Sequence, residues 1–182
     1  MKILFDACVL YPTVMRELLL GVADVGLYEP LWSARILEEW VRAAAKKGAT
    51  DELMARSEIA LCRARWPQAE VKENIGLEGE LYLPDRNDRH VLAAAITGDT
   101  GTIVTMNLKD FPKRHLAEFS IRAVHPDEFL TEHLTAHSAD VLGVSEKVRL
   151  EAERLSGQDW PMRKLMKKVR LPRFGKAMER LQ

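Results

Sequence analysis

The chain has 182 residues, of which 47% are hydrophobic and 30% are charged. This composition suffices for a hydrophobic core in one medium-sized domain, or in one domain that carries a helical appendage. Lysine plus arginine and aspartate plus glutamate both number 27, so the formal net charge is zero. That balance argues against a non-specific nucleic-acid binder that depends on net charge, and it leaves room for local basic patches.

Neither a targeting segment nor a membrane span is expected. The apolar run in the opening MKILFDACVL is too short for a signal peptide, and no later segment approaches the ~20 apolar residues that cross a bilayer. The two cysteines, Cys8 and Cys62, indicate no disulfide framework and fit a reducing compartment. We therefore expect a cytoplasmic protein.

The predicted elements alternate between strands and helices. The apolar run 2–5 predicts a buried strand that ends at the polar Asp6. Ser33 precedes a helical pattern that closes with lysines and a glycine, as a helix C-terminus does. In chain order, the pattern predicts a strand at 2–5, a helix at 12–22, a strand within 28–33, helices at 34–48 and 51–65, a helix at 89–98, a strand at 101–107, a turn at 108–112, a strand at 120–125 and a helix from about 126. The segment 68–84 is mixed and receives no element.

This alternation predicts an α/β domain with a parallel sheet and right-handed crossovers. In such sheets, ligands bind at the carboxyl ends of the strands. Asp6 and Asn107 both follow predicted strands, so we expect them to meet although they lie far apart in the sequence. Beyond about Thr131 the strand pattern ends and a helical tail follows.

Acidic residues occupy four positions at which such a fold would bring side chains together. They are Asp6 after the first strand, Glu38 and Glu39 in an early helix, Asp85 and Asp88 before the helix at 89–98, and Asp110 after a late strand. Carboxylates are ligands of hard divalent cations such as Mg²⁺ and Mn²⁺, and several in one crevice repel each other until protons or cations neutralise them. Such a site suits metal-dependent cleavage of phosphodiester bonds.

Each acid taken alone also has a purely structural explanation. Asp6 can be a polar strand terminus, and Asp110 a turn former. Helical glutamates are usually solvated, although Glu39 lies beside an apolar stripe. Asp85 or Asp88 alone can be a helix N-cap. The functional interpretation therefore rests on the joint placement of the acids.

Four short motifs, in this order, resemble those of the PIN-domain nucleases. ILFDACVLYP resembles the family's first strand, which runs into an aspartate and then an apolar helix. SARILEEW is similar to its serine-led second helix, whose glutamate corresponds to Glu39. PDRNDRHVLAAAI resembles the segment with the third acid, whose best match is Asp88, with Asp85 as an additional carboxylate.

The fourth motif, IVTMNLKDF, is similar to the family's late strand and its Thr-x-Asn-x-x-Asp-Phe pattern, here Thr105, Asn107 and Asp110. The resemblance implies a three-layer α/β/α sandwich with a central parallel sheet over residues 1–130. The change of pattern beyond about Thr131 indicates a helical, basic C-terminal extension over residues 131–182. It further implies an Mg²⁺- or Mn²⁺-dependent endoribonuclease. Small bacterial members of the VapC group are often toxins, so an antitoxin protein would be the partner, RNA the substrate, and dimers are common.

The resemblance also implies roles for individual residues. Catalysis and metal binding fall to Asp6, Glu39, Asp88 and Asp110, with Asp85, Thr105 and Asn107 in supporting positions. Flanking basic residues would hold the RNA backbone, namely Arg86, Arg89 and Lys109. Salt-bridging to the carboxylates is an equal alternative for Arg89. His90 is a less favoured candidate for a general base, because metal-activated water needs no histidine.

One departure from the family pattern opens an alternative. Many relatives have asparagine two residues after the first aspartate, where this chain has Cys8. A thiol does not reproduce an amide's hydrogen bonds, so a catalytically degenerate PIN domain that binds RNA or a protein is the second hypothesis. A phosphotransfer enzyme with Asp6 as nucleophile is a third, although such enzymes usually need an aspartate at the position of Cys8.

The C-terminal tail is strongly basic. From Pro161 onward it carries eight lysines and arginines against a single acid, Glu179. A solvated helix face, an RNA-binding arm and a surface for an acidic partner are all compatible with this pattern. Interspersed apolar residues such as Leu165 and Val169 indicate a docked or partner-binding helix.

Overall fold

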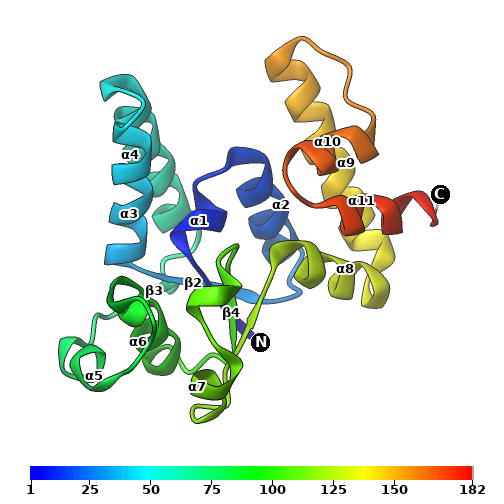
Figure 1. Cartoon of the computed structure of the whole chain (residues 1–182). Coiled ribbons are helices and arrows are strands. Elements are labelled where there is room, and N and C mark those ends of the chain that lie inside the picture. The colour runs from blue at the N-terminus through cyan, green and yellow to red at the C-terminus, as the bar shows by residue number, and fades with distance from the viewer. Residues whose placement is uncertain (182) are drawn as a thin grey trace. The chain divides into compact units, whose positions relative to one another are not determined.

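The computed structural model describes residues 1–181 and contains a parallel five-stranded sheet (Figure 1). The strands are β1 Lys2–Phe5, β2 Glu29–Ser33, β3 Glu70–Val71, β4 Thr102–Val104 and β5 Arg122–Val124. Their order is β3-β2-β1-β4-β5, and all neighbouring pairs are parallel. The predicted α/β class with a parallel sheet is therefore confirmed.

The sheet reverses its winding between β1 and β4. The chain moves outward from β1 through β2 to β3, and then returns to place β4 on the other side of β1. Leu4 is paired with Ile103 and Phe5 with Val104, so the two strands end side by side. In open parallel sheets, ligands bind at the carboxyl ends of the strands at this switch point. Asp6, which follows β1, and Thr105, which follows β4, are the residues placed there.

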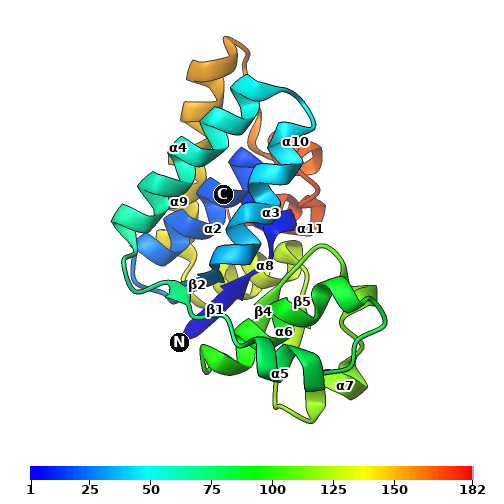
Figure 2. The same ribbon diagram turned by 90° about the vertical axis from the view of Figure 1, so that its left-hand side faces the viewer.

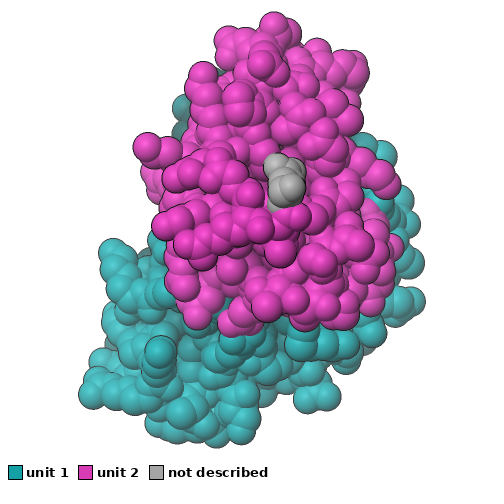
Figure 3. Space-filling view, turned by 90° about the vertical axis from the view of Figure 1, so that its right-hand side faces the viewer, with its two compact units in different colours: residues 1–11, 28–124 teal, residues 12–27, 125–182 magenta. Residues whose placement is uncertain are grey.

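The chain divides into two compact units, which Figure 3 colours separately. Unit 1 comprises residues 1–11 and 28–124, and it contains the sheet. Unit 2 comprises residues 12–27 and 125–182, and it is helical as far as residue 181. A segment from near the N-terminus therefore belongs to the same unit as the C-terminal helices.

Helices cover both faces of the sheet in unit 1. Its helices are α1 Ala7–Leu10, α3 Ala34–Ala45, α4 Ala49–Arg65, α5 Ile75–Glu80, α6 Arg89–Thr97 and α7 Lys113–Ala117, with short 3₁₀ turns η1 Arg86–Asp88 and η2 Leu108–Asp110. α3 and α4 lie on one side, and α5 and α6 on the other (Figures 1 and 2). The layers form the three-layer α/β/α arrangement. Ser33 begins α3 as predicted, because its hydroxyl accepts a 3.2 Å hydrogen bond from the Ile36 amide.

Small residues let α6 approach the sheet closely. Ala93, Ala94 and Ala95 are buried on this helix. At its C-terminal end, a Cβ atom on Gly98 would lie 2.8 Å from Leu31 Cδ1 of β2. α6 is thereby fixed against the sheet, and with it the residues that precede the helix, including Asp88.

Unit 2 contains the helices α2 Thr13–Asp24, α8 Pro126–Ala136, α9 Ser138–Ser156, α10 Met162–Lys168 and α11 Pro172–Glu179. α2 packs against α9 so closely that a Cβ on Gly21 would lie 2.7 Å from Val144 Cγ1. The buried Asp127 carboxylate accepts hydrogen bonds from the Arg173 and Phe174 amides, at 3.1 and 2.8 Å. These bonds satisfy the free amides at the start of α11.

The basic tail is packed within unit 2 through its apolar residues. Leu165, Met166, Leu171, Phe174 and Met178 are all buried. Its charged residues lie on the outer side, where Lys168 and Lys164 approach the Trp160 ring and Arg163 pairs with Glu179. Of the interpretations open from sequence, the tail thus has the packing of a docked helical segment. None of the helices in residues 1–181 is long and apolar enough to cross a membrane.

Candidate active site

Asp6 lies at the switch point and is held by three contacts. Its side chain is almost fully buried, and its backbone amide donates a 3.1 Å hydrogen bond to the Val104 carbonyl. The Thr105 hydroxyl donates to Asp6 Oδ2 at 2.7 Å, and the Cys8 thiol donates to the same oxygen at 3.1 Å. A buried carboxylate needs such partners, because desolvation otherwise disfavours its charged form.

Cys8 takes part in this network. Burial, followed by the nearby charge of Asp6, raises the pKa of the Cys8 thiol to about 12. The sulfur is therefore protonated near neutral pH and can donate to Asp6. It also accepts a 3.2 Å hydrogen bond from the Met106 amide. The thiol thus ties Asp6 to the backbone that follows β4, a supporting role that sequence reasoning had expected to be weakened here.

Asp88 is the acid whose pKa responds to the charges of the other acids. It is half-buried, and its pKa is raised from 3.8 to about 6. Burial is the largest cause, and the negative charges of Asp6, Asp110, Asp85 and Glu39 follow in that order. Four of the other predicted acids therefore lie close enough to Asp88 to disfavour its ionisation.

The two neighbouring aspartates have different roles. Asp85 is exposed, and its carboxylate accepts a 2.8 Å hydrogen bond from the Asn87 amide, which caps η1. Asp88 occupies the N-cap position of α6, yet its side chain makes no capping hydrogen bond. The structural explanation offered by the sequence thus applies to Asp85. The Asp88 carboxylate is left available for a ligand.

The two adjacent glutamates of α3 face different helices. Glu38 pairs with Arg56 of α4 at 3.5 Å. Glu39 Oε1 lies 2.9 Å from His90 Nε2 of α6, within ion-pair distance although not aligned as a hydrogen bond. The buried His90 has no hydrogen-bond partner at either ring nitrogen within residues 1–181. Glu39, and not Glu38, is the glutamate whose charge acts on Asp88.

The segment after β4 supplies the remaining predicted residues. Thr105 is fully buried, and its hydroxyl also accepts a 3.1 Å hydrogen bond from the Asn107 amide. Asp110 ends η2 and is half-buried, and its charge acts on Asp88. The side chains of Asn107 and Lys109 are exposed. Thr105 therefore supports Asp6, while Asp110 belongs to the acidic group.

Arginines line a pocket of about 420 Å³ next to this group. Its lining residues are Arg35, Glu73, Ile75, Glu78, Gly79, Arg86 and Arg89. Arg35 pairs with Glu78 at 2.9 Å, whereas the Arg86 side chain forms no hydrogen bond or ion pair within residues 1–181. The Nε atom of Arg89 is buried without a hydrogen-bond partner among those residues. The salt-bridge alternative for Arg89 therefore has no support in these contacts.

The donor set is compatible in kind with a hard divalent cation. It consists of carboxylate oxygens whose mutual repulsion a positive charge would relieve. Within residues 1–181, no three His, Cys, Asp or Glu side chains already stand together at metal-binding positions. Ligation by these acids therefore needs side-chain adjustment, which half-buried Asp88, Glu39 and Asp110 leave room for.

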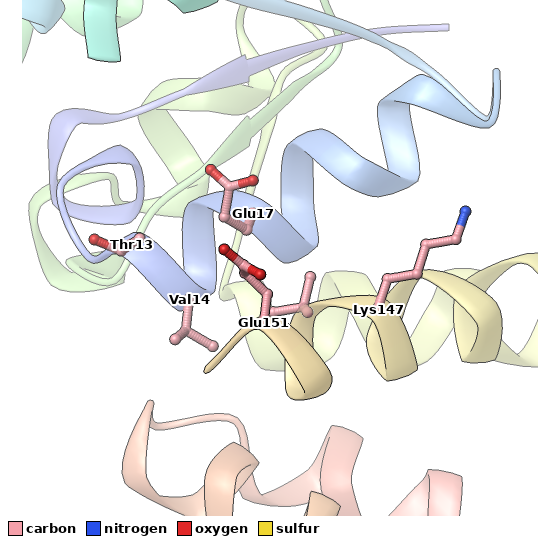
Figure 4. Close-up of a pocket in the computed structure, with 6 residues that line it drawn as sticks. Thr13, Val14, Glu17, Lys147 and Glu151 are labelled. Carbon is pink, nitrogen blue, oxygen red and sulfur yellow. The ribbon is translucent and has the colours of Figure 1, made fainter. Parts of the chain in front are cut away.

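A second hollow, in unit 2, contains none of the predicted site residues (Figure 4). It lies between α2 and α9, has a volume of about 250 Å³ and a mainly apolar lining. Thr13, Val14 and Glu17 line it from α2, and Lys147, Val148 and Glu151 from α9. This hollow is therefore not the predicted metal-binding site.

Carboxylates gathered at the switch point of a doubly wound parallel sheet define an α/β protein with an acidic site at its strand ends. The chain belongs to the PIN-domain family, whose model, described as PIN domain, matches residues 2–109. The protein named "Putative ribonuclease VapC50" from Mycobacterium tuberculosis (strain ATCC 25618 / H37Rv) is 48% identical over 61 residues. That match covers 31% of this chain and 36% of the relative, so the chain is aligned with about a third of that protein. No solved structure matches the chain significantly.

Proposed function

We propose that the protein is an Mg²⁺- or Mn²⁺-dependent endoribonuclease. The observation that carries the proposal is the placement of buried Asp6 at the switch point, where β1 and β4 end side by side, with the Asp88 carboxylate free of a capping bond at the start of α6. The charges of Asp6, Asp110, Asp85 and Glu39 act on Asp88 and, after burial, raise its pKa. A group of carboxylates that repel one another at a ligand-binding edge costs stability, and a bound cation would remove that cost. Membership of the PIN-domain family and the partial similarity to VapC50 support the same chemistry.

Asp6, Glu39, Asp88 and Asp110 are the residues that would hold the cation. When bound, a divalent ion activates water and stabilises negative charge on the oxygens of the phosphodiester. Thr105 and Cys8 hold the Asp6 carboxylate in place through their hydrogen bonds. Asp85 and Asn107 would support these ligands without binding the cation directly.

Positive groups beside the acids would hold the RNA backbone. Arg86 and Arg89 flank Asp88, and Lys109 precedes Asp110. Arg86 and Lys109 are exposed, so both can reach phosphates in solution. The arginine-lined pocket adds Arg35, which the sequence analysis did not single out.

We also propose that this ribonuclease is the toxin of a toxin–antitoxin pair. The support is the resemblance to the VapC group and the similarity to VapC50 over 61 residues. A cognate antitoxin would then be the protein partner, and a homodimer is the form to look for. A small protein encoded beside this one that co-purifies with it and suppresses its RNA cleavage would support the toxin role, and unchanged cleavage in its presence would argue against it.

The degenerate-domain alternative was based on Cys8. The Cys8 thiol donates to Asp6 and accepts from Met106, so this departure from the family pattern retains a link between the two strand ends. The alternative therefore has no separate observation in its favour. Calorimetric titration with Mn²⁺ distinguishes the two, because a degenerate domain would keep its fold and bind no metal.

Cleavage of structured and unstructured RNAs tests the main proposal. The intact protein should cut RNA with Mn²⁺ or Mg²⁺ and stop when EDTA is added. Asp6→Asn and Asp88→Asn should lower the rate by at least about 100-fold, because each removes a charge that the ion requires. Glu38→Gln is the matched control, since Glu38 pairs with Arg56 outside the acidic group. Cleavage that survives EDTA or both aspartate substitutions would sink the mechanism.

A further inference from the structure

Tyr82 is the most exposed aromatic side chain in residues 1–181. Its exposed fraction is 61%, Phe119 follows at 38%, and the other aromatic side chains are half-buried or buried. Its chain neighbours Leu81 and Leu83 are both buried, at 5% and 1%. Leu81 has an extended backbone, in which successive side chains point to opposite faces. Burial of the two leucines therefore directs the Tyr82 ring outward.

Two neighbours hold the ring without covering it. The Arg89 guanidinium lies 6.0 Å from the centre of the Tyr82 ring. The His115 ring centre lies 5.1 Å away, with the two ring planes tilted by 58°. A tilted neighbour and a cation at this distance restrict the ring's movement, while its exposed fraction leaves much of its surface open.

Arg89 links the ring to the segment that carries Asp88. Arg89 begins α6 immediately after Asp88, so the residue that approaches Tyr82 is the sequence neighbour of Asp88. Arg86 and Arg89 line the same pocket on this side of unit 1. Arg89 therefore approaches the open aromatic face, lines the same pocket as Arg86 and follows Asp88 directly in the chain.

An exposed aromatic ring beside guanidinium groups is suited to one class of ligand, single-stranded nucleic acid. Proteins that bind single-stranded nucleic acid stack bases on aromatic side chains and hold phosphates with nearby cations. Stacking on Tyr82 would also offset the repulsion between RNA phosphates and the acids, because it does not depend on charge. A base inside a duplex is covered on both faces, whereas an unpaired base can place one face on the ring.

We propose that Tyr82 is a stacking platform for an unpaired nucleobase of the substrate, on the side of the proposed site where Arg89 lies. The inference rests on the proposed ribonuclease function and deepens it, since it specifies RNA that is single-stranded at that position. Arg86 and Arg89 hold the backbone of the same nucleotide segment. Tyr82 is thus a substrate-positioning residue that acts through base stacking.

The test measures RNA binding by the full chain, separately from cleavage. Short RNAs carry the fluorescent base 2-aminopurine at successive positions, and Ca²⁺ replaces Mn²⁺, with gel analysis to show that the RNA stays intact. Stacking on Tyr82 should quench the label at one position. Tyr82→Phe should retain both quenching and affinity, while Tyr82→Leu should lose the quenching and weaken binding by about 5- to 100-fold. Phe119→Leu, the control at the next most exposed aromatic side chain, should behave as the unmodified protein.

Several outcomes would overturn this assignment. Equal affinity and quenching for Tyr82→Leu and the unmodified protein would do so, as would equal binding of duplex and single-stranded RNA. Loss of binding to a protein partner, with RNA binding unchanged, would assign the ring to a protein interface instead. If the unmodified protein neither binds nor cuts RNA, the ribonuclease proposal itself fails. An unchanged Mn²⁺-induced rise in the melting temperature of Tyr82→Leu would show that the fold and the acidic group are intact.

Discussion

The Thr105 hydroxyl donates a 2.7 Å hydrogen bond to Oδ2 of Asp6 and thereby joins the ends of the two central strands. Both side chains are buried, so water cannot replace the bond if it is lost. The same hydroxyl accepts from the Asn107 amide, which fixes the direction of its proton toward Asp6. Thr105 therefore orients the carboxylate on which the proposed metal site depends.

Replacing this hydroxyl should weaken metal binding without unfolding the protein. Thr105→Val keeps the volume but removes the donor to Asp6, and we expect Mn²⁺ affinity to fall about 10- to 100-fold, as for other partners that orient a ligand. Thr105→Ser keeps the hydroxyl and should stay within a few fold of the unmodified protein. Calorimetric titration measures both. Equal affinities for the valine and serine variants would contradict the role assigned to Thr105.

The Cys8 thiol should react slowly with alkylating agents. Because its pKa is raised to about 12, the reactive thiolate is on the order of 10⁻⁴ of the population at pH 8. Iodoacetamide labelling of Cys8, followed by mass spectrometry in a Cys62→Ala variant, should therefore be far slower than labelling of the urea-unfolded chain. The rate should rise with pH up to pH 10 and beyond. Labelling as fast as that of a free cysteine would show that the thiol is not protonated beside Asp6.

Burial of Asp88, together with repulsion from the neighbouring acids, should lower its contribution to the stability of the metal-free protein at neutral pH relative to mild acid. The unfolded chain releases this proton near pH 3.8 and the folded chain near pH 6, so the folded state holds more protons between these values. The free energy of unfolding therefore contains a contribution that falls as pH rises from about 4 to 6 and then levels off.

Asp88→Asn should remove this contribution. Because Asp88 is partly exposed, we expect a gain of about 1 kcal/mol at pH 7.5 in EDTA, or about 2–4 °C in melting temperature. The gain should shrink toward pH 4, where the unmodified side chain is protonated. Glu38→Gln is the control, and it should show no such pH-dependent gain, because Glu38 has Arg56 as partner. A destabilised Asp88→Asn at pH 7.5 would contradict the raised pKa of Asp88 and its two causes, burial and repulsion.

Divalent metal should raise the melting temperature of the unmodified protein. At a Mn²⁺ concentration of 100 times the dissociation constant, binding adds about 2.7 kcal/mol to the free energy of unfolding, or roughly 5–10 °C. The rise should be lost in Asp6→Asn, whose remaining carboxylates lack the buried ligand. Scanning calorimetry with and without EDTA measures it. A rise of the same size in Asp6→Asn would place the metal elsewhere.

The Asp127 carboxylate should be important for the stability of unit 2. It accepts from two amides at the start of α11, and Asp127→Ala would leave the buried Phe174 amide and the part-buried Arg173 amide without this acceptor. We expect a loss of about 1–3 kcal/mol in the free energy of unfolding, measured by urea titration followed by circular dichroism. Asp140→Ala, at an exposed position on α9, provides the comparison and should cost less than about 0.5 kcal/mol. If the two substitutions lower the free energy of unfolding by the same amount, the hydrogen bonds between Asp127 and the start of α11 do not contribute to stability.

Structural features that depend on local sequence patterns were predictable. The short strand that ends at Asp6 and the cap formed by Ser33 follow from burial and helix-start rules, and the structure has both. β3 and α5, in the segment left without an element, escaped prediction for physical reasons. β3 has only two residues, too few for a periodic pattern, and α5 contains Gly76 and Gly79, which lower helix propensity.

Contacts between distant segments were not predictable in the same way. The donor role of Cys8 depends on Thr105 and Met106, which reach it only because β4 pairs with β1. The division of roles between Asp85 and Asp88 depends on the 3₁₀ turn that lies between them. The proximity of Asp6, Asp88 and Asp110 could be anticipated, because strand ends and helix starts meet at one edge of a parallel sheet.

The membership of α2 in unit 2 has a consequence for synthesis. Leu18, Leu19 and Val22 of α2 are fully buried, and Gly21 packs against Val144 of α9. The ribosome produces α2 well before α9, which begins only at Ser138. During translation, the apolar face of α2 therefore stays exposed until α9 has left the ribosomal exit tunnel. A nascent chain stalled before Ser138 would expose this face to chaperones, so the folding of unit 2 depends on the synthesis of α9.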